Sequence, residues 1–171
     1  MAYVTSGIIE ELVKYRILQY TVPVGRPIRA RIWLTMAAAA SLGFSTTEAV
    51  SQLDTITQDI NQGIDLSYMK VLGPMLIGPA IHVLGGELIG LNMIRQDILK
   101  ERLSIFDIVT SATLFHAGYS IILMLANALQ LFVGGADPRD KMLTVFAVGY
   151  VLVYFEVFRR KLAVLKTRVP V

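Results

Sequence analysis

The chain has 171 residues, of which 54% are hydrophobic and only 17% charged, and its mean hydropathy is +0.59. Soluble domains carry about 45–50% apolar and about 25% charged residues, so this composition is typical of a membrane protein. The absence of cysteine excludes disulfides, thiolate metal sites and cysteine nucleophiles, and a net charge of +3 is too small to indicate a nucleic-acid partner.

An amphipathic helix is predicted first, over about residues 7–20, with Ser6 as its N-cap. Such a helix is suited to lying on a membrane surface or against a partner. Pro23 and Pro27 cannot continue it, so residues 1–27 are expected to form an interfacial helix and a Pro/Gly linker. The two faces consist of apolar Ile8, Ile9, Leu12, Val13 and Ile17 and of charged Glu10, Glu11, Lys14 and Arg16.

Residues 28–68 are predicted to hold a short apolar helix, 28–44, followed by a capped amphipathic helix. Ser45 and Glu48 have the spacing of a capping box, in which each side chain satisfies a backbone amide of the other residue. Seventeen residues are at the short end of the length that crosses a bilayer. Whether 28–44 is a membrane span therefore stays open.

Three long apolar segments dominate residues 69–171, which end in a basic tail; they are Met69–Ile94, Ile105–Val133 and Met142–Phe158. A helix of about 20 apolar residues crosses a hydrocarbon core of about 30 Å, so the first two segments are long enough and the third nearly so. The sequence predicts an all-α integral membrane protein with about four transmembrane helices, three being possible, plus the N-terminal amphipathic helix. With four crossings the basic residues share one side, which places both termini on the cytoplasmic (or matrix) side.

Small and polar residues mark helix faces that are expected to pack against other helices. Gly78, Gly86 and Gly90 lie on the first long segment, where small residues let a neighbouring helix approach closely. Ser120 and Asn127 belong to a polar stripe on the second segment. An unmet polar group in hydrocarbon costs several kcal/mol, so this stripe is expected to face protein.

Two histidines are candidate cofactor ligands. His82 and His116 lie near the middle of consecutive apolar segments, so antiparallel packing would bring them to similar depth, where they could be axial ligands of haem b. The run His82–Glu87 resembles the haem-bearing helix of succinate dehydrogenase membrane anchors, with Leu88 and Ile89 in place of the arginine–histidine pair of that family. This resemblance implies a haem or quinone site. The other interpretation is that both histidines hydrogen-bond across a helix interface.

Glu87 is the other ionisable group inside an apolar segment. A carboxyl in this position is suited to carrying a proton or an ion in a transporter. It lies about 140° of helix rotation from His82, so the two side chains do not form one site. It also lies two turns from Arg95, where pairing or solvation is the simpler interpretation.

No pattern typical of an enzyme is recognisable, since the chain has neither a phosphate-binding loop nor an HExxH zinc motif. The sequence therefore predicts a non-catalytic structural subunit without a cofactor, packed in the lipid bilayer against other membrane subunits or copies of itself. Two alternatives remain open. One is a self-assembling α-helical coat protein of a virus or filament, and the other is a haem b or quinone-binding anchor subunit of a respiratory complex.

Overall fold

The computed structural model describes residues 2–21, 29–63, 73–132 and 137–169, and these residues form helices joined by short connections. The all-α prediction is confirmed. The elements are α1 (Ala2–Thr21), α2 (Ala30–Asn61), a π-helical turn η1 (Gly73–Ile77), α4 (Gly78–Asp97), α5 (Ile105–Phe132) and α6 (Asp137–Lys166). Among the described residues three helices, α4, α5 and α6, are long and apolar enough to cross a membrane.

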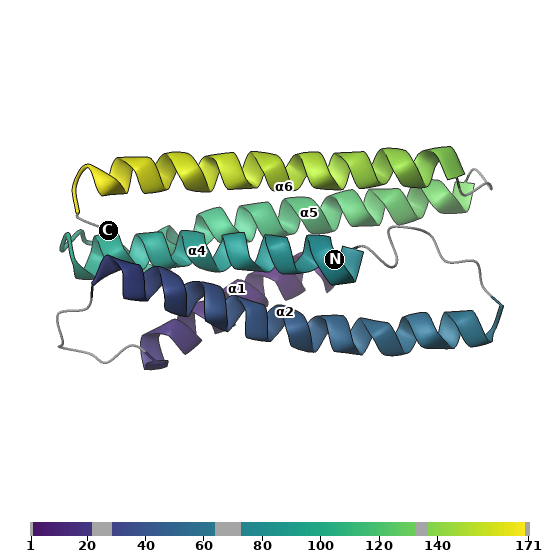
Figure 1. Ribbon diagram of the computed structural model, residues 1–171, viewed down its shortest axis with the longest axis horizontal. Helices are drawn as coiled ribbons and strands as arrows, with labels where there is room; N and C mark the ends of the chain where they lie inside the picture. Colours follow the sequence, from purple (N-terminus) through teal and green to yellow (C-terminus); the bar gives the residue numbers. More distant parts are fainter. Residues whose placement is uncertain (1, 22–28, 64–72, 133–136, 170–171) are drawn as a thin grey trace.

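The helices form an elongated bundle with α4 at its centre (Figure 1). Helix α4 contacts α1, α2, α5 and α6. The start of α2, the connection between α4 and α5 and the end of α6 all lie at one end of the bundle (Figure 1). We call this the basic end, because it collects most of the cations near the helix termini, among them Arg29, Arg95, Lys100, Arg102, Lys166 and Arg168.

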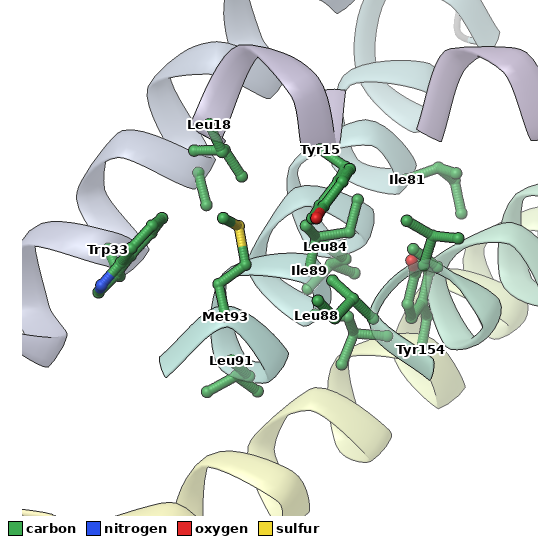
Figure 2. Packing of buried hydrophobic residues seen from close by; sticks show 14 of the residues in the cluster. Tyr15, Leu18, Trp33, Ile81, Leu84, Leu88, Ile89, Leu91, Met93 and Tyr154 are labelled. Atoms are coloured by element: carbon green, nitrogen blue, oxygen red, sulfur yellow. The ribbon is translucent and has the colours of Figure 1, made fainter. Parts of the chain in front are cut away.

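The central position of α4 explains its composition. Leu88, Ile89 and Ile94 are completely buried, since neighbours cover α4 on several sides. Figure 2 shows Leu88 and Ile89 between aromatic residues of three other helices, which are Tyr15 of α1, Trp33 of α2 and Tyr154 of α6. In a membrane the lipid tails are as apolar as leucine, so close packing rather than the hydrophobic effect favours this arrangement.

The outer side of α6 is apolar and exposed. Val145, Leu152 and Val153 are all more than half exposed, whereas Ala147 and Tyr154 on the opposite side are buried. A continuous row of exposed apolar side chains on a soluble domain would promote aggregation. On an integral membrane protein it is the surface that lipid tails cover.

In the middle of α1, charged side chains are buried and apolar side chains are exposed, which is the reverse of an amphipathic helix in a soluble protein. Glu11 and Lys14 are 0% exposed, whereas Ile9 is 60% exposed, and Ile8 and Val13 are also exposed. The predicted helix is present but begins at Ala2, so Ser6 lies inside it and is not its N-cap. Glu11 and Lys14 are directed toward the other helices, whereas Ile8, Ile9 and Val13 are directed outward together with Arg16. Such an arrangement is stable where the surroundings are less polar than the interior of the bundle.

Helix α2 is continuous from Ala30 to Asn61, so the predicted helix start at Ser45 is wrong. Ser45 Oγ donates back to the carbonyl of Leu42 at 3.0 Å, as serine does inside a helix. Glu48 does not return to the backbone amide of Ser45. Its carboxylate instead lies 2.6 Å from His82 Nε2 on α4, and this contact between helices replaces the local cap.

Helices α2 and α4 approach each other closely at two glycines. A Cβ atom on Gly86 would lie 1.9 Å from Ser41 Oγ and 2.8 Å from the Ala37 carbonyl oxygen. A Cβ atom on Gly90 would lie 3.0 Å from Ala37 Cβ. These two positions leave no room for a larger side chain. The third glycine of the predicted packing set, Gly78, is the half-buried first residue of α4.

Replacing Gly86 with alanine should therefore force α2 and α4 apart. We expect Gly86→Ala to destabilise the protein by about 1–3 kcal/mol, the usual cost of an overpacked interior, and to lower the thermal unfolding midpoint in detergent. Gly149→Ala in α6 is the matched control, because nothing lies within 4 Å of its Cβ position. An unfolding midpoint of Gly86→Ala equal to that of Gly149→Ala would contradict the close packing.

Candidate metal centre

Six ionisable side chains from four helices meet inside the bundle, and we call them the polar cluster. Helix α1 contributes three of them, while α2, α4 and α5 contribute one each. The members are Glu10, Glu11, Lys14, Glu48, His82 and His116.

The two histidines form the centre of the polar cluster. The rings of His82 and His116 lie edge to face with their centroids 5.0 Å apart, and both side chains are buried. Glu10 completes a group in which one ligand atom of each residue lies within 4.8 Å of the others. The backbone makes room for this group at Gly7, where a Cβ atom would lie 3.2 Å from His116 Cδ2.

Each histidine is held by a carboxylate on a different helix. His82 Nε2 lies 2.6 Å from Glu48 Oε2, and His116 Nδ1 lies 2.9 Å from Glu11 Oε1. A carboxylate on one ring nitrogen fixes the orientation and tautomer of an imidazole whose other nitrogen binds a metal ion. The polar cluster thus contains two pairs of the kind that supports metal-binding histidines.

The donors that remain are suited to a metal ion. His82 Nδ1 and Glu10 Oε2 are buried without a hydrogen-bond partner among the described residues. His116 Nε2 lies 3.4 Å from Glu10 Oε2, close enough for attraction but without hydrogen-bond alignment. Because a buried polar atom without a partner is costly, a cation that these atoms coordinate would remove that cost. Two imidazoles and a carboxylate are also a donor set that zinc enzymes use.

The net charge of the polar cluster also favours a bound cation. Lys14 Nζ lies 2.6 Å from Glu11 Oε1, with both side chains inaccessible to solvent, and 5.6 Å from the centroid of the Phe44 ring. Three carboxylates and one lysine leave two negative charges when the histidines are neutral. A divalent cation would balance this excess, which is otherwise expensive inside a protein.

Residues 1–157 match the family model of the PrsW family intramembrane metalloproteases. The chain belongs to this family. All members of the polar cluster lie within the matched residues. No match was found among curated proteins or among solved structures.

Membership of the PrsW family corrects the predicted function. The chain is an enzyme, so the prediction of a non-catalytic structural subunit is wrong, and so are the coat-protein and respiratory-anchor alternatives. A metalloprotease family implies a metal ion where the sequence predicted no cofactor. Haem b does not suit His82 and His116 either, because axial ligands aim their nitrogens at one iron from opposite sides of the porphyrin, whereas these rings meet edge to face. The prediction of an integral membrane protein is consistent with an intramembrane protease and with the apolar helices.

The structure brings some of the other singled-out residues to the cluster and leaves others away from it. Ser120 is buried and donates to the carbonyl of His116 at 3.1 Å, within its own helix. Glu87 is half-buried and has no hydrogen bond or ion pair with any residue that the structure describes. Asn127 belongs to α5, but its side chain lies outside the described residues.

Sequence reasoning missed the three carboxylates that contact the histidines, and the lysine that pairs with one of them. It places Glu10, Glu11 and Lys14 on the charged face of an interfacial helix and Glu48 in a capping box. The signal that could have identified them is the concentration of charge in α1, where two adjacent glutamates and a lysine interrupt an apolar stretch in a chain with few charged residues.

Replacing Glu48 with glutamine should weaken metal binding without removing a ligand. We expect Glu48→Gln to lower the metal affinity about 10–100-fold, the usual effect of losing a carboxylate behind a ligating histidine. The dissociation constant can be measured by competition with a fluorescent chelator. Asp54→Asn is the matched control, because Asp54 lies on the same helix, outside the polar cluster, and accepts a hydrogen bond from Gln58. Equal affinities of the two variants would contradict the supporting role of Glu48.

Proposed function

We propose that this protein cleaves peptide bonds of membrane-embedded or membrane-adjacent substrates with a divalent metal ion held by Glu10, His82 and His116. The observation that carries the proposal is the convergence of two histidine–carboxylate pairs and a third carboxylate inside a bundle of this protease family. Zinc is the first candidate for the ion, since it favours nitrogen and oxygen ligands of this kind.

When bound, such an ion supplies Lewis-acid polarisation of the scissile carbonyl and lowers the pKa of a water molecule. The residues of the chain have supporting tasks. Glu48 and Glu11 orient the two imidazoles. Lys14 provides the opposite charge that a fully buried Glu11 requires.

Glu11 also has a free oxygen that is suited to proton transfer. Its Oε1 is engaged by Lys14 and His116, whereas its Oε2 is buried without a partner among the described residues. A Cβ atom on Gly85 would lie 3.1 Å from both Glu11 Oε2 and the Tyr154 hydroxyl. We assign Glu11 Oε2 as the proton acceptor; the Tyr154 hydroxyl, which is also buried without a hydrogen-bond partner among the described residues, lies on the same side of Gly85.

The polar cluster lies at membrane depth. His82 is inside the candidate span Met75–Asp97, and His116 is inside the candidate span Ile105–Ile122. Both are several residues from the ends of these spans, so a water-soluble peptide has no direct access from the aqueous phase. This position favours substrates whose cleaved bond lies in or next to the bilayer.

We also place α1 across the membrane rather than on its surface. Its 20 residues extend about 30 Å, most of its exposed side chains up to Val13 are apolar, and it packs against α5, α2 and α4. Glu10, Glu11 and Lys14 of this helix belong to the polar cluster, whereas Arg16, closer to its end, is exposed. In this arrangement the amino terminus lies on the side opposite to the basic end, and the basic end is cytoplasmic.

Removing a metal ligand should abolish proteolysis. We expect His116→Gln and Glu10→Gln to reduce cleavage of a membrane-embedded reporter in proteoliposomes by about 10⁴-fold, the scale for loss of a catalytic group. A chelator should inactivate the wild type, and added zinc should restore it. Glu87→Gln is the control, because Glu87 is an ionisable residue of a membrane helix outside the polar cluster. A His116→Gln variant with the wild-type rate would refute the proposed site.

The orientation of α1 can be tested with single cysteines, because the chain has none of its own. We expect Ala2→Cys and Gln62→Cys to react with an impermeant maleimide added outside intact cells, and Arg102→Cys to react only after lysis. The physical reason is that α1 ends and α2 begins near the basic end, and both helices lead away from it toward Ala2 and Gln62 (Figure 1). Labelling of Ala2→Cys only together with Arg102→Cys would instead return α1 to the cytoplasmic surface.

A further inference from the structure

A cavity of about 320 Å³ lies at the basic end of the bundle, between α4 and α6. Its lining residues are of two chemical kinds. Cationic side chains come from Arg95, Arg160, Lys161 and Arg168. Apolar side chains include Leu91 of α4 and Val164 of α6.

Two of the cations are held in place by neighbouring polar groups. Glu101 accepts from Arg95 Nε at 2.8 Å through one oxygen and from Arg168 Nη1 at 2.6 Å through the other. These two hydrogen bonds hold the pKa of Glu101 below its usual range, so the link between the arginines is charged at neutral pH. Asn92 also accepts from Arg95 Nη1 at 3.2 Å and is itself fixed by donating to the Ile108 carbonyl at 2.9 Å.

The cavity retains an excess of positive charge. Its four cations are contacted by two carboxylates, Glu101 and the Glu156 that pairs with Arg160, which leaves a surplus of two positive charges. The nearby Asp97 lies 3.8 Å from Lys100 rather than in the cavity wall. Lys161 has no ion pair with any residue in the described part of the chain. Ammonium and guanidinium groups gathered in this way are suited to a phosphate group.

We propose that this cavity binds an anionic phospholipid, with the phosphate against Arg95 and Lys161 and an acyl chain along Leu91 and Val164. A soluble phosphate ion would contact the cationic side chains alone, whereas a phospholipid would also cover the apolar side chains. The cavity lies near the cytoplasmic ends of two candidate membrane spans, at the level of the headgroups. Basic pockets between transmembrane helices on this side of the membrane are suited to anionic headgroups.

The lipid would also stabilise a weakly covered part of the fold. Val164 is 63% exposed, and most of α6 faces outward, so this end of α6 has few protein neighbours apart from α4. A ligand that contacts Arg95 on α4 and Lys161 on α6 joins the two helices. Binding should therefore raise the thermal unfolding midpoint, and this effect does not depend on protease activity.

The test measures that midpoint for the full chain in an uncharged detergent with three additives: dihexanoyl-phosphatidylglycerol, dihexanoyl-phosphatidylcholine and inorganic phosphate. We expect only phosphatidylglycerol to raise the midpoint of the wild type, by several degrees. Lys161→Gln should lose at least half of this shift without losing an ion pair. Lys166→Gln is the matched control, because it makes the same change on the same helix outside the cavity and should keep the full shift.

Each other result would overturn the proposal. No shift in the wild type would exclude lipid binding, and equal shifts in all three proteins would indicate diffuse attraction to the basic end. A shift of the same size with inorganic phosphate would identify an ion from solution as the ligand. Native mass spectrometry is an independent readout: anionic lipid should remain bound to the wild type and to Lys166→Gln, and be depleted from Lys161→Gln.

Discussion

The ion pair between Glu11 and Lys14 constrains much of this structure. Both side chains are inaccessible to solvent, and their charged atoms lie 2.6 Å apart on one face of α1. Charges removed from water are tolerated only where opposite charges and hydrogen bonds replace the lost hydration. The face of α1 that carries them must therefore pack against a polar surface, and His116 of α5 provides it. Ile8, Ile9 and Val13 are consequently on the outer side of the bundle.

The same requirement extends to the other helices through the histidines. Glu48 contacts His82 and so links α2 to α4, while Glu11 contacts His116 and links α1 to α5. The edge-to-face contact of the two rings joins these two links into one arrangement. Close approach of α2 to α4 at Gly86 and Gly90 is compatible with the first link, since a larger residue there would separate the helices. The polar cluster is thus a structural centre as well as a candidate catalytic one.

Sequence reasoning predicted the apolar helices well, because length and composition are enough to specify them. It could not predict the direction that α1 faces, since an amphipathic pattern defines two faces but not which one meets the solvent. In water Ile9 would turn inward and Glu11 outward, and the structure shows the reverse. Ser45 and Glu48 illustrate a second limit. Their spacing is that of a local cap, and only the fold reveals that Glu48 reaches a histidine 34 positions away.

Helix α4 connects the candidate metal centre to the basic end. His82 and Arg95 are 13 residues apart, which corresponds to about 20 Å along a helix. Between these levels α6 packs on α4 and delivers Tyr154, whose ring stacks on Phe115 with centroids 4.1 Å apart. The Tyr154 hydroxyl reaches the space beside Gly85, next to Glu11. Helix α6 contacts α4 more than any other element, so whatever holds it against α4 at the basic end also contributes to where the Tyr154 hydroxyl lies. A phospholipid in the cavity would therefore act on the geometry of the metal centre through the position of one rigid helix.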